Sequence, residues 1–389
     1  MESARKYEAM GDVMQQLRDY LSSNADFATA FEAAFKLAKA MNIPQFTEYG
    51  IETFQDYINY YETMLTWTPS ETLDGKNIYY HLCMFYFVID LPPVKLYQTP
   101  IRPTSVPPWT WLSQWVILFA NEMGNFMDTP ASLTPASLAT FYDAPLYHMA
   151  DYAPFPGPWN TFNKFFARHI NPSARPIDSL TDPTVIVSPA DATFDGSWPI
   201  DSNADVTTFN IKHLPWSIDQ LLQDSIYGER FKGGVFMHSF LAPYDYHREH
   251  APVAGKVLEA RVVPGLCYLQ VVAKPDKDRN LKLTMQRELD APDEPGYQFL
   301  QARGVIVLDN PDIGLVAVCP IGMCQVSSVV LSVKEGDTVQ KGDKISYFQM
   351  GGSDIVVVFE APSKVNITAV KGQHYNFGKQ IATAQVITK

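Results

Sequence analysis

Cysteine is scarce in this sequence of 389 residues, and long hydrophobic runs are absent. Its four cysteines form no C-x-x-C pair, which argues against a disulfide framework, a zinc knuckle and a redox motif. We expect all four to be small buried side chains; they are Cys83, Cys267, Cys319 and Cys324. The most apolar stretch, residues 78–89, contains His81 and is too short to cross a bilayer.

Positive charge is also in short supply. The chain has 30 Lys and Arg against 42 Asp and Glu, for a net charge of −12. Such a surface repels phosphate backbones and anionic lipids, so we expect no nucleic-acid partner. The start, MESARKYEAMGDVMQQLRDYL, lacks the apolar core of a signal peptide. We expect a soluble, cytoplasmic protein, and leave room for peripheral membrane contact through amphipathic helices such as residues 24–41.

The hydrophobic pattern changes along the chain. Apolar side chains recur at helical spacing in residues 27–41 and 111–126, and the proline-rich stretch 92–108 between them predicts an irregular connector. From about residue 180, short β-branched runs are bounded by Gly, Pro, Asp and Asn, which favours antiparallel strands. We therefore predict an α+β protein, with a helical region over 1–155 and a mainly antiparallel β-domain over 156–389.

Residues 333–348, VKEGDTVQKGDKISYF, predict two strands linked by glycine-containing turns. Lipoyl and biotinyl carriers use a similar hairpin and present their modified lysine in a tight turn between its strands. Lys341 is only a turn residue in this pattern, so we expect the hairpin without the carrier function.

Histidines cluster in the segment FMHSFLAPYDYHREHAPVAG, residues 236–255, which holds His238, Asp245, His247 and His250. Histidine exchanges its proton near neutral pH, so the cluster is a candidate acid–base or metal site. A metal would need a third and a fourth ligand with good geometry, and nearby prolines argue for a loop, so we expect no metal. Structural histidines, on the surface or satisfied in the core, remain the alternative.

Two further segments carry polar residues that a β-core does not need. In VSPADATFDG, residues 187–196, Asp191 follows a strand and a proline, where a lone Asp most often caps a turn. In YFQMGGSDIVVVFE, residues 347–360, Gly352 and Ser353 precede an apolar strand and could simply form a bulge or turn. The functional interpretation is a strained Gly352–Ser353 bond beside a hydroxyl nucleophile, with a histidine as base and an aspartate that orients it.

Together these segments resemble the phosphatidylserine decarboxylase family of pyruvoyl enzymes, from about residue 158 onward. The similar stretches, in order, are WNTFNKFFARHINPSARPID (159–178), VSPADATFDG, IKHLPWSIDQLL (211–222), LAPYDYHREHAPVAG and GDTVQKGDKISYFQMGGSDIVVVF. Residues 1–150 resemble the helical extension of soluble fungal decarboxylase-like members, which include tryptophan decarboxylases. Five motifs in one order are far more specific than any single motif.

The resemblance implies a proenzyme that cuts itself between Gly352 and Ser353, leaving a β chain of 1–352 and an α chain of 353–389. It assigns Ser353 as nucleophile, His250 as its base, Asp191 as the carboxylate orienting that base, and His247 to the substrate site. The covalent pyruvoyl group made from Ser353 would form a Schiff base with a substrate amine and act as the electron sink, without PLP or metal.

The chain also departs from the family pattern. Asp354 stands where the family usually has Thr or Ser, and it would either slow processing or recognise a substrate cation. Ser327 and Ser328 replace the usual Gly-Ser of another segment.

Several functions therefore stay open. We expect decarboxylation of a free L-amino acid, such as aromatic tryptophan, with phosphatidylserine conversion to phosphatidylethanolamine as the alternative. An unprocessed, non-catalytic relative that binds a ligand or partner is a further alternative, and a metal-dependent hydrolase is another. Partners would be the small-molecule substrate and the two chains of one precursor, and a homodimer is left open.

Overall fold

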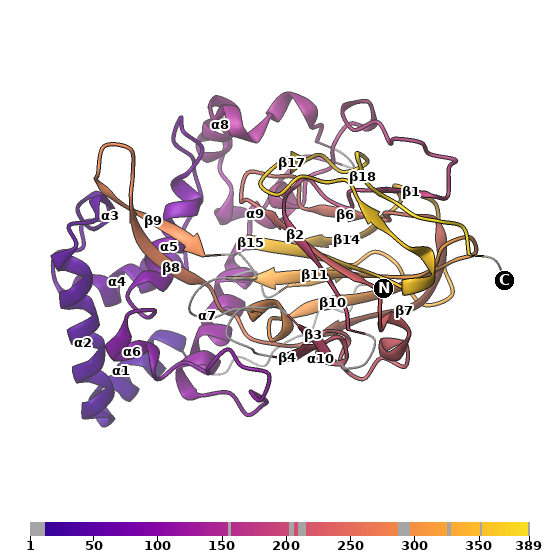
Figure 1. The fold of residues 1–389 in the computed structure, drawn as a ribbon. Helices are drawn as coiled ribbons and strands as arrows, with labels where there is room; N and C mark the ends of the chain where they lie inside the picture. Colours follow the sequence, from indigo (N-terminus) through magenta and orange to yellow (C-terminus); the bar gives the residue numbers. More distant parts are fainter. Residues whose placement is uncertain are drawn as a thin grey trace.

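The computed structural model describes residues 12–154, 157–201, 206–208, 215–286, 296–324, 328–350 and 352–387. Helices make up most of its N-terminal part and strands most of the rest, as Figure 1 shows. All ladders between the described strands are antiparallel. The predicted α+β class is therefore confirmed.

The N-terminal helices follow the apolar stripes of the sequence. They are α1 (Val13–Ser23), α2 (Ala25–Ala40), α3 (Pro44–Glu48), α4 (Phe54–Met64), α5 (Asn77–Phe87), α6 (Pro92–Lys95), α7 (Trp111–Met127) and α8 (Pro135–Asp143). The Asn24 side chain caps α2 by accepting a hydrogen bond from the Phe27 amide, and the aromatic stripe of this helix is buried. The predicted helices over 27–41 and 111–126 are thus confirmed.

The proline-rich stretch 92–108 is not wholly irregular, because the short helix α6 begins at Pro92. Proline is tolerated in the first turn of a helix, where the amides have no intrahelical acceptor. The remainder of the stretch, from residue 96 onward, contains no helix or strand.

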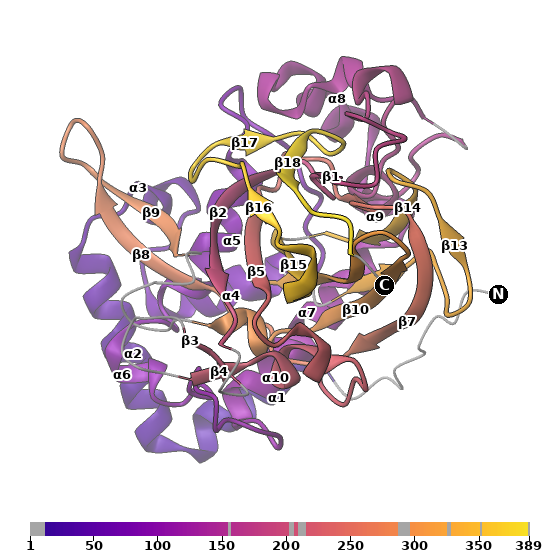
Figure 2. The same ribbon diagram turned by 45° about the vertical axis from the view of Figure 1, so that its right-hand side comes forward.

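One large sheet forms the centre of the β-domain, with strand order β13-β7-β10-β11-β15-β5-β2-β17. Its strands are β2 (Ala192–Pro199), β5 (Val235–Leu241), β7 (Gly255–Val263), β10 (Arg303–Asn310), β11 (Gly314–Met323), β13 (Thr338–Val339), β15 (Gly352–Phe359) and β17 (His374–Tyr375). β15 lies between β11 and β5, and Figure 2 shows it inside the curved sheet. Its run of β-branched residues is buried on both faces, as expected for a central strand.

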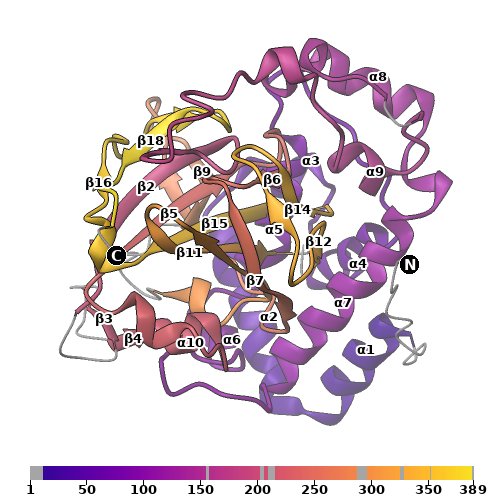
Figure 3. The same ribbon diagram turned by 90° about the vertical axis from the view of Figure 1, so that its right-hand side faces the viewer.

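Smaller sheets flank this large one, as Figure 3 shows from the side. Their strands are β1 (Val185–Val187), β16 (Asn366–Ile367) and β18 (Gln380–Thr383); β6 (Arg248–His250), β12 (Val329–Leu331) and β14 (Lys344–Phe348); β3 (Val206–Thr208) and β4 (Pro215–Ser217); and β8 (Gln270–Pro275) and β9 (Leu281–Gln286). The short helices α9 (Phe162–Phe166) and α10 (Ile218–Leu222) and the 3-10 turn η6 (Tyr297–Phe299) connect or cover them.

The predicted lipoyl-like hairpin over 333–348 is not formed. Its two strands exist as β13 and β14, but β13 pairs with β7, whereas β14 pairs with β12 and β6 in another sheet. Between them the chain turns through Gly342, whose φ of +87° favours glycine. Lys341 is buried there, and its Nζ donates to the carbonyls of Ser179 and Asp182, so this lysine is not presented as in a carrier.

The helices and the β-domain share one continuous hydrophobic cluster. Three polar contacts join α5 and its C-terminal end to the β-domain: Tyr86 Oη donates to the Cys267 carbonyl, and the amides of Val271 and Met285 donate to Asp90 and Tyr79. The four cysteines are buried thiols, as predicted. Among the helices described, none combines the length and the apolar character needed to cross a membrane.

Candidate active site

Ser353 is the second residue of the central strand β15. It lies in register with Gly322 of β11 and Leu241 of β5, and its side chain is fully buried. Its Oγ has no hydrogen-bond partner among the residues that the structure describes. A buried hydroxyl without a partner is unfavourable by about 1–3 kcal/mol, so it calls for a functional explanation.

The chain leading to Ser353 runs beside the histidine segment. The Phe348 amide donates to the His247 carbonyl over 3.0 Å, and the Met350 amide donates to Asn163 Oδ1 of α9 over 3.0 Å. On the other side of the candidate cleavage point, Ser353 is paired with Leu241, six residues before His247. The chain on both sides of the Gly352–Ser353 bond therefore contacts the same segment, residues 241–247.

His247 ends the loop before β6, and its ring is fully buried. Within the described part of the chain, neither ring nitrogen has a hydrogen-bond partner, and the ring stacks on Phe166 of α9 at a centroid distance of 3.9 Å. Burial, with a smaller effect of the Arg168 cation, lowers the pKa of His247 well below its usual value. The imidazole is therefore neutral at pH 7.

His250 is the last residue of β6 and is held by contacts on both ring nitrogens. Nδ1 lies 2.6 Å from the Gly342 carbonyl, so Nδ1 carries the proton and Nε2 accepts from Tyr246 Oη at 3.1 Å. The ring also stacks on Phe377 at 3.8 Å. Burial lowers the pKa of His250 to about 3, which keeps this histidine neutral as well.

Asp191 precedes β2 and is bound by Arg175 rather than by a histidine. Arg175 Nε and Nη2 lie 3.0 and 2.7 Å from Asp191 Oδ2, and the Phe377 amide donates to Oδ1 over 2.8 Å. Asp191 and His250 therefore both contact Phe377: Asp191 accepts a hydrogen bond from its amide, and the His250 ring stacks on its ring. The His250 amide also donates to the carbonyl of Pro189, two residues before Asp191.

The sequence interpretation missed Arg168, which supports the loop that ends at His247. Its Nη2 donates to the carbonyls of Tyr244 and Asp245 over 3.1 and 3.2 Å, and its guanidinium lies 4.2 Å from the Tyr152 ring centroid. Asp245 in turn accepts from the Ala242 amide and lies 3.0 Å from His374 Nε2. The motif FFARHI, which contains Arg168, could have drawn attention to this residue. Its hydrogen-bond partner Tyr244, however, lies 76 positions further along the chain.

His238 and Asp354 form a separate group on the opposite face of β15. Asp354 is fully buried, accepts a 2.8 Å hydrogen bond from Tyr297 Oη and lies 3.2 Å from His238 Nε2. His238 Nδ1 lies 3.3 Å from Asp195 Oδ2. Burial alone would lower the pKa of His238, but Asp354 and Asp195 raise it to about 9, so this histidine is charged at pH 7.

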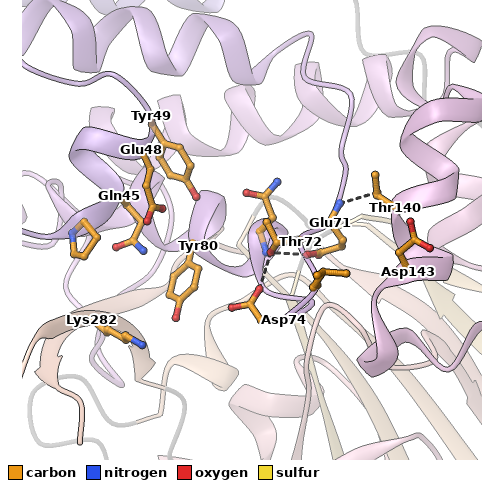
Figure 4. A pocket seen from close by; sticks show the side chains of 13 residues that line it. Gln45, Glu48, Tyr49, Glu71, Thr72, Asp74, Tyr80, Thr140, Asp143 and Lys282 are labelled. Atoms are coloured by element: carbon orange, nitrogen blue, oxygen red, sulfur yellow. Dashed lines mark hydrogen bonds between the residues drawn. The ribbon is translucent and has the colours of Figure 1, made fainter. Parts of the chain in front are cut away.

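A cavity of about 750 Å³ lies elsewhere, at the junction of α3, α5, α8 and β9. Figure 4 shows carboxylates and two tyrosines in its wall, and no candidate site residue lines it. Over the described ranges, no group of three or more His, Cys, Asp or Glu side chains is arranged to hold a metal ion.

Comparison with known proteins shows to which family the chain is similar. The family model described as phosphatidylserine decarboxylase matches residues 162–383. The Bacillus cereus protein named phosphatidylserine decarboxylase proenzyme is 32% identical over 226 residues, which cover 58% of this chain and 77% of that protein.

Two fungal proteins are similar over shorter parts of their length. Phosphatidylserine decarboxylase proenzyme 3 of Schizosaccharomyces pombe is 34% identical over 204 residues, or 52% of this chain and 19% of that protein. The protein named Decarboxylase iboD of Amanita muscaria is 29% identical over 234 residues, or 58% of this chain and 65% of that protein. This chain thus spans less than two thirds of either fungal relative.

Proposed function

The chain belongs to the phosphatidylserine decarboxylase family, and we propose on that premise that it cuts itself at Gly352–Ser353 and then acts as a pyruvoyl-dependent decarboxylase. The observation that carries this proposal is the buried Ser353 hydroxyl at the start of β15, which has no hydrogen-bond partner among the residues that the structure describes. A serine that serves only the fold would be hydrogen-bonded or exposed.

The cleavage uses the chain's own atoms and one water. Ser353 Oγ attacks the Gly352 carbonyl carbon, and the peptide bond is replaced by an ester. Loss of the Ser353 Cα proton expels the Gly352 carboxylate, and water then replaces the nitrogen of residue 353, which leaves as ammonia. The products of each precursor are a β chain of 1–352, an α chain of 353–389 with a pyruvoyl end, and one molecule of ammonia.

His250 is the proposed base for Ser353, and Asp191 its orienting carboxylate. The neutral state of His250 suits a base, and the Gly342 carbonyl selects the tautomer with a lone pair on Nε2. In the uncut chain that lone pair accepts a hydrogen bond from Tyr246 Oη. His250 must therefore release Tyr246 before it can accept the proton of Ser353 Oγ. Asp191 supports this geometry through Phe377, which it binds by the amide and on which His250 stacks.

His247 is proposed to act on the substrate. Its ring nitrogens find no hydrogen-bond partner in the described part of the chain, and it lies beside the segment that leads to Ser353; both observations support a role in binding or protonation. The pyruvoyl group supplies the electron sink for loss of carbon dioxide. Arg168 holds the loop that presents His247, and Phe166 fixes the plane of its ring.

The proposed substrate is a free L-amino acid, because it has the α-amine with which a pyruvoyl group reacts. The net charge of −12 supports this choice, because an acidic protein is repelled by anionic lipid surfaces. Phosphatidylserine is the second candidate, favoured by the names of the Bacillus cereus and Schizosaccharomyces pombe relatives.

The test begins with the intact mass of the purified protein under denaturing conditions, beside a Ser353→Ala control. We expect a fragment of residues 353–389 with a blocked, carbonyl-bearing end in the wild type alone. Carbon dioxide release is then measured with tryptophan, with the other L-amino acids and with phosphatidylserine vesicles. A wild type that stays uncut would contradict the proposal and favour the non-catalytic relative, and release from phosphatidylserine alone would select the second substrate.

A further inference from the structure

We propose that Asp354 is an anchor that fixes the end of the α chain after cleavage. This inference rests on the proposed function, because it concerns the residue whose amide nitrogen would carry the pyruvoyl group. Asp354 is a positioning residue in this proposal, and its partners are Tyr297 and His238.

Asp354 points away from the nucleophile. Successive side chains of a strand lie on opposite faces, so Ser353 and Asp354 face different sides of the sheet. Asp354 shares its face with His238, since Asp354 pairs with Phe240 and His238 lies two residues before Phe240 in β5. The carboxylate is fully buried there, so contact with a substrate on the Ser353 face would require the strand to turn over.

The anchor is built from three different elements. Tyr297 of η6 donates to Asp354 Oδ2 over 2.8 Å, and His238 Nε2 of β5 lies 3.2 Å from the same oxygen. Asp195 of β2 lies 3.3 Å from the other nitrogen of His238. Charge-assisted contacts of this kind are short and directional, and here they fix one side-chain oxygen relative to η6 and two strands.

Cleavage creates the need for such an anchor. In the uncut chain, residue 353 is held by covalent bonds on both sides and by its neighbours in β11 and β5. After the cut it is a chain end, and chain ends fray unless they are tied down. Asp354 is the first residue of the new chain with a complete side chain, so its contacts restrain the end closest to the reacting carbonyl.

The decisive experiment compares hydrogen exchange at the amides of residues 354–359 before and after cleavage. Asp354→Ala is made in the wild type, which is cut, and in Ser353→Ala, which is not. We expect exchange in the cut protein to accelerate by about tenfold or more and in the uncut protein by less than about twofold, because only the cut strand has a free end. Equal acceleration in both would overturn the proposal, since the contact would then be merely structural.

Turnover gives a second, independent measurement. For the cut Asp354→Ala enzyme we expect kcat to fall by about 10- to 100-fold with KM within about threefold, since a small displacement of a reacting group has effects of this size. Val358→Ala is the matched control, because it truncates another buried side chain on the same face of β15. It should retain kcat within about twofold.

Tyr297→Phe removes one hydroxyl, and it allows the anchor to be tested if Asp354→Ala does not fold. Its kcat should fall by about three- to tenfold, with complete cleavage. Normal kcat in cut Tyr297→Phe and cut Asp354→Ala would overturn the anchor, and so would a block of cleavage in both. A wild type that is itself uncut would instead refute the proposed function, so the two failures are distinguishable.

Discussion

Replacement of Arg175 by methionine should destabilise the uncut protein strongly, because it leaves a buried carboxylate without its counter-ion. Asp191 and Arg175 are both nearly buried, and the guanidinium binds Asp191 through two of its nitrogens. Removal of one partner of a buried pair typically costs about 3–5 kcal/mol. The Phe377 amide still donates to Asp191, so we expect a value near the lower limit, about 3 kcal/mol.

Replacement of Asp191 instead of Arg175 should lower the free energy of unfolding by a smaller amount. In Asp191→Asn, the Arg175 cation keeps Asp151, whose Oδ2 lies 3.0 Å from Nη1, so we expect about 1–2 kcal/mol. The double variant should be more stable than Arg175→Met alone, because it also removes the buried carboxylate that Arg175→Met leaves without its counter-ion.

Urea unfolding at pH 7 measures all three free energies, with Ser353→Ala as the common background so that every protein is a single chain. Arg175→Met costing less than about 1 kcal/mol, or less than Asp191→Asn, would refute the assignment of Arg175 as the essential counter-ion of Asp191.

Three further predictions concern the histidines. His250→Ala should leave the chain uncut, whereas His247→Ala should be cut but fail to release carbon dioxide; denaturing mass measurement and a turnover assay separate the two, and the opposite pattern would exchange the roles. Tyr246→Phe should cut at least as fast as the wild type, because the His250 lone pair is no longer occupied; slower cleavage, followed by time-resolved mass measurement, would show that Tyr246 assists the base. The pKa of His238 is raised to about 9 in the folded protein, above its ordinary unfolded value, so its stabilising contribution is complete below about pH 6.5 and is lost as the pH rises through 9. Urea unfolding of Ser353→Ala between pH 6 and 10 should show this loss, and His238→Gln should reduce the slope; an unchanged slope would contradict the charged state of His238.

Local sequence patterns predicted the local structure well. The stripe of Phe27, Phe31 and Phe35 specifies the buried side of α2, and its cap Asn24 can be identified because capping involves neighbouring residues. The motif order also predicted the family, which the comparisons confirm. Strand partners were less accessible: residues 333–348 contain two strands, but nothing within them indicates that β13 and β14 pair in different sheets.

The site was predictable in its residue types but not in its contacts. The sequence motifs single out Asp191, His247, His250 and Ser353, and the roles assigned to these residues stay predictions. The contacts that the structure adds join distant segments: Asp354 and Tyr297 lie 57 positions apart, and Asp245 and His374 lie 129 apart. Such pairs depend on how strands cross the sheet, and a single sequence carries no periodic signal for them.

The position of β15 within the sheet has a consequence for the lifetime of the protein. After a cut before Ser353, the short chain would carry β15, β16, β17 and β18. β15 would remain hydrogen-bonded to β11 and β5 of the long chain, and the other three strands would remain paired to strands of the long chain or to each other. The two pieces would stay together without a covalent link, although their folding had been directed by one continuous chain. Unfolding would then separate them, and reassembly would depend on two molecules meeting. Each matured molecule would therefore work from a single folding event, and its durability would be set by its rate of unfolding rather than by an equilibrium.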